Sequence, residues 1–334
     1  MTSLSAPQHE SGPGRGLTIE AGAETLRRIQ QAVSSRVIGQ PAAIDDALVA
    51  FLARGHLLIE GVPGTAKTLL VRALSAALGI RAARIQFTPD LMPSDVTGVS
   101  LLRDPARGFE FQPGPIFTAI LVADEINRAP AKTQAALLEA MAERQVTVDG
   151  VTRQLDPLFT VYATQNPVEH EGTYPLPEAQ LDRFLLKAVV PYPAPEAELE
   201  MLTLHEQGFD PERDPSLGIA PVVDAAEALA LRSLVDSVRV APELRSYIAS
   251  ITAATRSDPA ISLGASPRAT VALMRAARAA AVLDGRDYAV PDDAKSRAPA
   301  ALRHRITLAP EVEVEGRSVD EVLNAILTRV TAPQ

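Results

Sequence analysis

The chain has 334 residues, which at about 150 residues per domain suggests two domains. It contains no cysteine, so disulfide frameworks, thiolate metal sites and cysteine nucleophiles are excluded. The 32 Lys and Arg residues against 41 Asp and Glu residues give a net charge of −9. This balance argues against a broadly basic surface for nucleic acid.

The first residues carry no targeting signal. Residues 1–16 are rich in Ser, Gly and Pro and lack the apolar run of a signal peptide. We therefore predict a disordered tail over residues 1–19 and a cytoplasmic protein. No run of about 18 apolar residues occurs, so we expect no membrane span.

Residues 20–192 alternate between helical and strand patterns, which is typical of an α/β domain. Helices are expected over 23–35, 41–53 and 67–78. The strand candidates are continuous apolar runs, as expected for strands of a parallel sheet that helices cover on both faces. They lie at residues 56–60, 83–88, 119–124, 159–164 and 184–190.

Two segments interrupt this alternation, and a proline-rich segment ends it. Residues 89–116 and 145–158 are typical of hairpins, the second because Asp149-Gly150 stands between β-branched runs. Three prolines within residues 191–195 suggest an interdomain boundary. We therefore expect an α/β domain over 20–192 and a small all-helical domain over 193–334, with helices at 196–206, 224–235, 243–255, 267–283, 291–302 and 319–330.

The strongest chemical signal is the run Gly61-Val62-Pro63-Gly64-Thr65-Ala66-Lys67-Thr68, between a predicted strand and a predicted helix. Its glycines let backbone N–H groups turn onto phosphate oxygens, and the helix N-terminus adds partial positive charge. Lys67 would reach the β- and γ-phosphates of a nucleotide, and the Thr68 hydroxyl would bind Mg²⁺. The general pattern has Gly in place of Ala66, which is tolerable if the backbone there is right-handed. The alternative is a glycine-rich turn with an incidental Lys-Thr pair.

A second signal is the pair Asp124-Glu125, which ends the apolar run 119–124. A buried parallel strand places its last residue at the carboxyl edge of the sheet, beside the glycine-rich turn. Asp124 would hold Mg²⁺ through a water, and Glu125 would accept a proton from the attacking water. The alternative is a pair of carboxylates that caps the following helix.

These residues resemble the MoxR family of AAA+ ATPases over roughly residues 20–330. The family's phosphate loop also has Ala before the Lys, as in GVPGTAKT here. Further matching stretches are RIQFTPDLMPSDVTG at 84–98, FQPGPIFTAILVADEINRAP at 111–130, ATQNP at 163–167, LPEAQLDRF at 176–184 and SPRA at 266–269. The resemblance implies a P-loop domain with a five-stranded parallel sheet, two insertions at the predicted hairpins, and a helical lid domain.

Several residues take their roles from this resemblance. Asn166 matches sensor 1, Arg183 the arginine finger that acts on a neighbouring subunit's nucleotide, and Arg268 sensor 2. Their plainer alternatives are an Asn-Pro turn, an arginine paired with Asp182 or Glu178, and a solvated arginine.

The implied site therefore has three overlapping sets. The catalytic set is Lys67, Glu125, Asn166, Arg183 and Arg268. The nucleotide-binding set comprises residues 61–68, Leu69, Asp124 and Arg268, together with Val37, Ile38 and Gly39, which would lie against the adenine. The metal set is Thr68 and Asp124. Arg128 and Arg144 are alternative trans-acting arginines, and Thr88 is a candidate contact of Glu125.

The resemblance implies an ATP-hydrolysing homo-oligomeric ring, most often a hexamer, that uses ATP and Mg²⁺. Family members resemble chaperones that mature partner complexes, often with von Willebrand factor A domains. The alternatives are a nucleic-acid motor, which the acidic balance disfavours, a nucleotide-switched binding module, which Glu125 and Arg183 argue against, and a small-molecule kinase.

Overall fold

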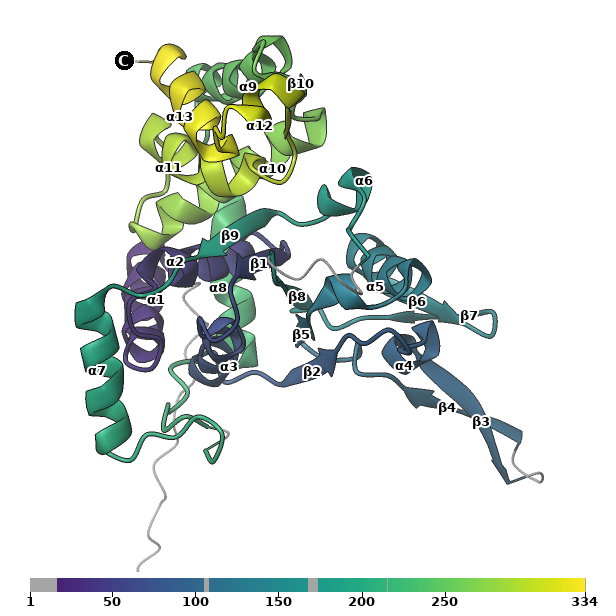
Figure 1. Cartoon of the computed structure of the whole chain (residues 1–334). Helices are drawn as coiled ribbons and strands as arrows, with labels where there is room; N and C mark the ends of the chain where they lie inside the picture. Colours follow the sequence, from purple (N-terminus) through teal and green to yellow (C-terminus); the bar gives the residue numbers. More distant parts are fainter. Residues whose placement is uncertain (1–16, 105–107, 168–173, 215, 334) are drawn as a thin grey trace, which may run out of the picture.

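The computed structural model describes residues 17–104, 108–167, 174–214 and 216–333 (Figure 1). The first helix, α1 (Ile19–Ser34), begins after Thr18, whose hydroxyl accepts a hydrogen bond from the N–H of Ala21. Most of the predicted N-terminal tail, residues 1–16, lies outside the described residues. Within the described part of the chain, no helix is both long and apolar enough to cross a membrane.

A five-stranded parallel sheet forms the centre of the first domain, as predicted. Its strand order is β2-β5-β8-β1-β9. The strands are β1 (Leu57–Gly61), β2 (Ala82–Gln86), β5 (Ile120–Asp124), β8 (Thr160–Gln165) and β9 (Leu186–Val190).

Helices cover both faces of this sheet, and the strand residues alternate between two cores. On β5, Ile120 and Val122 belong to the core that faces α1, α2 (Pro41–Leu52) and α3 (Lys67–Ala77). Leu121 and Ala123 belong to the core beneath α5 (Ala131–Glu143). Because both faces are covered at β1, β5 and β8, these inner strands appear in the sequence as largely apolar runs.

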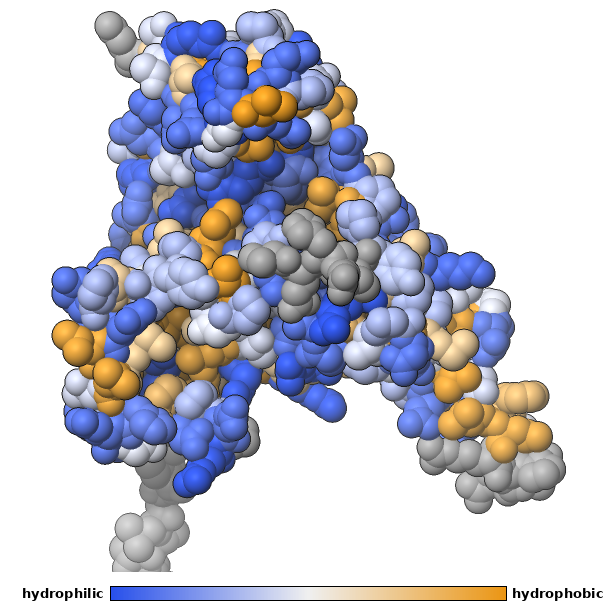
Figure 2. All heavy atoms as spheres, in the orientation of Figure 1, coloured by the Kyte–Doolittle hydropathy of each residue, from blue (hydrophilic) through white to orange (hydrophobic). Residues whose placement is uncertain are grey.

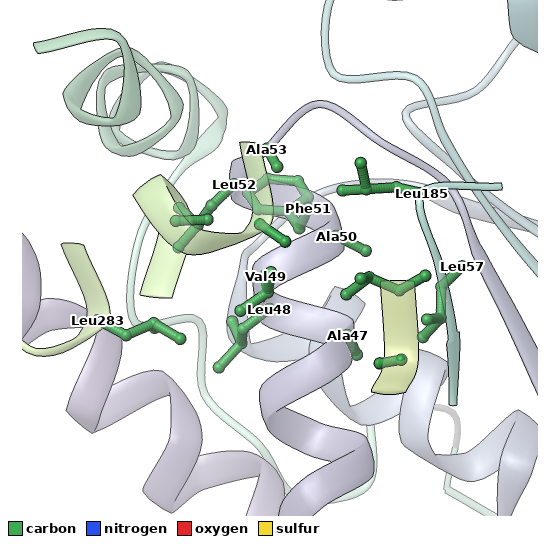
Figure 3. Packing of buried hydrophobic residues seen from close by; sticks show 14 of the residues in the cluster. Ala47, Leu48, Val49, Ala50, Phe51, Leu52, Ala53, Leu57, Leu185 and Leu283 are labelled. Atoms are coloured by element: carbon green, nitrogen blue, oxygen red, sulfur yellow. The ribbon is translucent and has the colours of Figure 1, made fainter. Parts of the chain in front are cut away.

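Helix α2 is buried along most of its length. Residues 47–53 are buried without exception, and Figure 3 shows this packing. The helix contacts β9 on one side and α10 (Pro267–Leu283) on another. A helix that is apolar all round is typical of such a sandwiched position, and α2 therefore joins the sheet to the lid.

Two antiparallel hairpins lie where the predicted interruptions are. The first, β3 (Gly98–Asp104) with β4 (Gly108–Pro113), follows the short helix α4 (Pro93–Thr97) and extends away from the sheet (Figure 1). The second pairs β6 (Gln145–Val148) with β7 (Val151–Gln154). Its turn residues Asp149 and Gly150 have φ of +52° and +75°, which matches the hairpin turn that the Asp-Gly pair predicts.

The C-terminal part is mainly helical, with one short antiparallel strand pair that the sequence did not predict. The lid at the top of Figure 1 contains α9 to α13 and this pair, β10 with β11. The elements are α9 (Pro242–Ser257), β10 (Ile261–Leu263), α10, α11 (Pro291–Leu302), β11 (Thr307–Leu308), α12 (Pro310–Val314) and α13 (Val319–Arg329).

Helices α7 (Pro195–Glu206) and α8 (Ala225–Ser237) precede this lid and lie beside the α/β domain (Figure 1). Helix α8 contacts α1 and α2 as well as α10. Its fully buried Arg232 donates hydrogen bonds to the carbonyl oxygens of Pro157 (3.1 Å) and Leu158 (3.0 Å), just before β8. Burial lowers the pKa of Arg232 to about 9, and its guanidinium lies 4.1 Å from the ring centroid of Phe51.

Candidate nucleotide site

The loop between β1 and α3 lies at the carboxyl edge of the parallel sheet, where α/β proteins bind ligands. A Cβ on Gly61 would lie 2.6 Å from the carbonyl oxygen of Val190, so only glycine lets β1 and β9 approach this closely. Gly64 has a φ of +82° and supplies the left-handed backbone that the loop requires.

Ala66 also has a left-handed backbone, with φ +61° and ψ 22°. We expected alanine to replace the usual glycine here because the backbone would be right-handed. That expectation is wrong. This conformation costs an L-residue about 1–2 kcal/mol. Ala66 is the residue before α3 and brings no side-chain cap, so the positive end of the helix faces the loop.

Lys67 is directed back across the loop that precedes it. Its ammonium donates hydrogen bonds to the carbonyl oxygens of Gly61 (2.6 Å) and Val62 (2.7 Å). The Thr65 hydroxyl donates to the same Val62 oxygen at 2.9 Å. The ammonium group is therefore held over the loop where an anion would enter.

Asp124 and Thr68 meet beside this loop. The Asp124 carboxylate is buried and accepts hydrogen bonds from the hydroxyls of Thr68 (3.1 Å) and Thr164 (2.9 Å). It also accepts one from Nε of Arg84 at 2.6 Å. A hydroxyl and a carboxylate are the hard oxygen ligands that Mg²⁺ takes, so these residues fit a magnesium ion with few protein ligands.

Glu125 has a left-handed backbone with φ +54°, which turns its side chain away from the strand direction. Its N–H donates to the Thr164 hydroxyl at 3.0 Å. Its carboxylate accepts hydrogen bonds from the Gln86 amide (2.7 Å) and from Arg128 (3.0 Å). Gln86 thus makes the contact with Glu125 that was predicted for Thr88. The Thr88 hydroxyl instead donates a hydrogen bond to Asp90, which lowers the pKa of that carboxyl.

The two remaining predicted groups on this side are Asn166 and the segment 37–39. Asn166 is buried directly after β8 and lines a cavity of about 560 Å³ between the sheet and the lid. A Cβ on Gly39 would lie 2.8 Å from that of Ala197 on α7. The segment therefore packs against the helix that follows β9, at the same edge of the sheet as the phosphate loop.

Three predicted arginines lie together at the opposite edge. Arg144, Arg183 and Arg268 line a cavity of about 160 Å³ with three further arginines, Arg54, Arg275 and Arg305. Gly55, His56 and Leu185, which precede β1 and β9, line the same cavity, so the length of a strand separates it from the phosphate loop. The structure therefore brings Arg183 and Arg268 together but does not bring them to Lys67 of the same chain.

This arginine cavity is rich in positive charge. Burial, and after it the neighbouring arginines, lower the pKa values of Arg144 and Arg275. The carboxylates nearby are already paired, Asp182 with Arg305 at 2.6 Å and Asp236 with Arg54 at 2.8 Å. Arg183 donates to the carbonyl oxygen of Leu138 at 2.7 Å and does not pair with Asp182 or Glu178, unlike the plainer alternative.

His56 lines the arginine cavity and is neutral. Burial lowers its pKa to about 3. Its Nδ1 accepts a hydrogen bond from the N–H of Val161 at 2.9 Å, so Nε2 carries the proton and donates to the carbonyl oxygen of Met141 at 3.2 Å. The histidine therefore adds no charge to the arginines above it.

Sequence reasoning missed several residues of both sites. Arg84, Gln86 and Thr164 lie on the strands that flank β5, and the β2-β5-β8 order alone would have pointed to them. Arg54 lies in the turn after α2 and Arg275 lies on α10, so they are far apart in the chain and no local pattern marks them.

Comparisons with known proteins agree with this geometry. Residues 56–186 match the family model for the ATPase family associated with various cellular activities (AAA), and residues 253–326 match the AAA lid domain. The chain is 50% identical to the uncharacterized protein YeaC of Bacillus subtilis, covering 86% of this chain and 88% of that protein. It is 40% identical to the chaperone MoxR1 of Mycobacterium tuberculosis, covering 98% and 88%, and 32% identical to the protein MoxR of Methylorubrum extorquens, covering 93% and 96%.

A solved crystal structure is also similar. It is that of a candidate ATPase from Cytophaga hutchinsonii, with a TM-score of 0.84 and 40% sequence identity. The match covers 94% of this chain and 96% of that one, so it extends over both domains.

Proposed function

The chain belongs to the MoxR family of AAA+ ATPases, and from this membership we propose that it hydrolyses ATP to ADP and phosphate at the interface between two copies of itself. The observation that carries the proposal is the meeting of Thr68 and Asp124 beside the phosphate loop, with Glu125 next in the chain. Together they supply a phosphate cradle, a cation site and a general base.

The residues of the loop divide the binding between them. The backbone of residues 61–66, the N-terminus of α3 and Lys67 bind the phosphates, with Leu69 in the first turn of the helix. Val37, Ile38 and Gly39 lie against the adenine. Mg²⁺ held by Thr68 and Asp124 would neutralise charge on the phosphate oxygens as the bond to the leaving group breaks.

Glu125 and Asn166 act on the attacking water. Glu125 accepts one proton of the water while the water oxygen bonds to the γ-phosphorus. The bond from the γ-phosphorus to the oxygen that it shares with the β-phosphate breaks, and ADP leaves with the electrons of that bond. Asn166 orients this water or the γ-phosphate through its amide. For this step the Glu125 carboxylate exchanges its contact with Gln86 for one with the water.

The arginine cavity acts on the nucleotide of a neighbouring copy. Because Arg183 and Arg268 lie at the edge of the sheet opposite the loop, only a second subunit can bring phosphates to them. Arg144 shares the cavity, whereas Arg128 forms an ion pair with Glu125 of its own chain, so we favour Arg144 as the additional trans-acting residue. Like charges held together are costly unless an anion offsets them, and a triphosphate would do so.

This head-to-tail arrangement closes into a ring, and we propose a hexamer. Helix α7 supports the ring because it lies at the phosphate-loop edge and exposes Leu199 (65%) and Leu202 (62%), which share a face one turn apart. Figure 2 shows apolar residues gathered over this helix. Its first turn carries Glu196 and Glu198, which complement the basic cavity of a neighbour.

We further propose that the ring remodels a protein client in the cytoplasm. The name of the chaperone MoxR1 supports this role. Figure 2 shows apolar residues exposed on the extended β3–β4 hairpin, where they suit a protein surface. The most exposed of them is Phe109. A client with a von Willebrand factor A domain rests on the family resemblance.

The test is the ATPase rate per subunit as a function of protein concentration. A site completed by a neighbour predicts a rate that rises through the concentration range of assembly and then reaches a plateau. Lys67→Ala should abolish the rate at every concentration. Lys132→Ala, which alters an exposed lysine on α5, should leave the rate unchanged. A rate per subunit that is flat through assembly would contradict the shared site, and no ATPase activity at all would contradict the proposed reaction.

A further inference from the structure

Three donors of the chain itself bind the Asp124 carboxylate. Its Oδ1 accepts from Thr164 (2.9 Å) and its Oδ2 accepts from Arg84 (2.6 Å), while the single hydroxyl hydrogen of Thr68 is shared between Oδ1 (3.1 Å) and Oδ2 (3.2 Å). The one unshared hydrogen bond to Oδ2 therefore comes from a positively charged group. A metal ion, or a water held by one, that approaches this carboxylate competes with these donors for its oxygens.

Arg84 is the donor that can leave at the lowest cost. The Thr68 and Thr164 side chains are short and are fixed on α3 and β8. The Arg84 side chain is long and 58% exposed, whereas that of Asp124 is 6% exposed, so the guanidinium reaches the carboxylate from the solvent side. It is also the only one of the three donors that carries a positive charge, and a divalent cation on the same carboxylate would repel it.

Arg84 also connects Asp124 to Glu125. Arg84 and Gln86 are two residues apart on β2 and therefore lie on one face of the strand, and Gln86 is in register with Asp124 on β5. The Arg84 guanidinium donates to the Gln86 amide oxygen at 3.0 Å, and the Gln86 amide nitrogen donates to Glu125 at 2.7 Å. When Arg84 moves away from Asp124, its hydrogen bond to the Gln86 amide oxygen is lost as well. That hydrogen bond orients the amide that holds Glu125.

We propose that Arg84 is a counter-ion that occupies Asp124 until Mg²⁺ arrives, and that its departure loosens the hold of Gln86 on Glu125. The inference rests on the proposed role of Asp124 in metal binding. It makes Arg84 a positioning residue that sets the Mg²⁺ requirement of the site. It also couples metal binding to release of the glutamate that accepts the proton of the attacking water.

The first experiment measures divalent-cation binding without nucleotide. Mn²⁺ is titrated into the full chain, and the unbound ion is followed by electron paramagnetic resonance. Arg84→Ala is expected to bind Mn²⁺ several-fold more tightly than the unaltered chain, and addition of Asp124→Asn is expected to abolish the gain. Arg81→Ala is the matched control, because it removes an equal charge from an exposed residue just before β2. Equal gains in both single variants would reduce the effect to net charge and overturn the proposal.

The second experiment measures the affinity of a fluorescent ADP analogue as Mg²⁺ is raised. The Mg²⁺ concentration for half of the full gain in affinity is expected to fall several-fold in Arg84→Ala and to stay unchanged in Arg81→Ala. Arg84→Lys keeps the positive charge and controls for a folding defect caused by altering this position. Its Mg²⁺ concentration for half of the gain should lie near that of the unaltered chain. A midpoint that rises in Arg84→Ala would mean that Arg84 positions Asp124 for the metal, which overturns the proposal. A chain that binds no nucleotide at any Mg²⁺ concentration contradicts the proposed function instead, and the Mn²⁺ titration still decides the role of Arg84.

Discussion

Acidification is expected to destabilise the folded chain through His56. This histidine is 4% exposed, and burial lowers its pKa from 6.5 to about 3. Between these two values the unfolded chain binds a proton that the folded chain does not, so the free energy of unfolding falls as the pH falls below 6.5. The stability that neutral His56 allows is fully present above pH 6.5.

The size of the effect follows from the two pKa values. A pH of 5 is 1.5 units below the pKa of 6.5 that His56 has in the unfolded chain, so the side chain is protonated there, while the folded side chain stays neutral. At about 1.4 kcal/mol per unit, His56 alone costs about 2 kcal/mol of stability at pH 5. His304, whose pKa is also lowered by burial, acts in the same direction. A domain stable by about 5–15 kcal/mol would register such a loss clearly.

The assay is urea unfolding at pH 7.5 and pH 5, comparing the unaltered chain with His56→Gln. Glutamine can donate and accept hydrogen bonds but does not titrate. The unaltered chain should lose about 2 kcal/mol more than His56→Gln between the two pH values. His205→Gln, which alters an exposed histidine on α7, should follow the unaltered chain. Parallel losses in the unaltered chain and His56→Gln would refute the reasoning.

Three further predictions concern the proposed site and ring. Glu125→Gln should keep nucleotide binding and lose about 10²-fold or more in hydrolysis rate, measured by nucleotide fluorescence and phosphate release; an unchanged rate would favour a nucleotide-switched binding module. Arg144→Ala and Arg183→Ala should each lower kcat, by about 10³-fold for an arginine finger, with little change in nucleotide affinity; reduced affinity of the isolated subunit would argue for action in cis. Leu199→Glu with Leu202→Glu should shift sedimentation toward single subunits without altering the circular dichroism spectrum, and an intact ring would remove α7 from the contact.

The sheet could be predicted from the sequence because its inner strands, β1, β5 and β8, are buried on both faces. These strands lie in largely apolar runs bounded by turn residues, and the five observed strands differ from the predicted ones by one or two residues at most ends. Short elements were missed, among them α4, α6 (Glu178–Leu181) and the β10–β11 pair. Helices and strands of two to five residues are too short to show a periodicity.

Contacts between distant residues could not be predicted. The expectation that Thr88 contacts Glu125 failed because the β2–β5 register, which places Gln86 opposite Asp124, is not written in local sequence. The arginine cavity combines residues from α5 and α10 with others that precede β1 and β9, and only the fold brings them together. The left-handed backbone of Ala66 was missed because alanine usually marks a right-handed position.

Mixing two inactive variants tests the central claim, that each site is completed by a neighbour. Glu125→Gln subunits keep Arg183, and Arg183→Ala subunits keep Glu125. In a ring assembled at random from equal amounts, half of the sites contain Glu125 and half of those face an intact Arg183, so about a quarter of the sites are complete. We predict that the mixture recovers about a quarter of the unaltered ATPase rate while each variant alone stays inactive. A mixture as inactive as its components, although sedimentation shows mixed rings, would contradict the shared site.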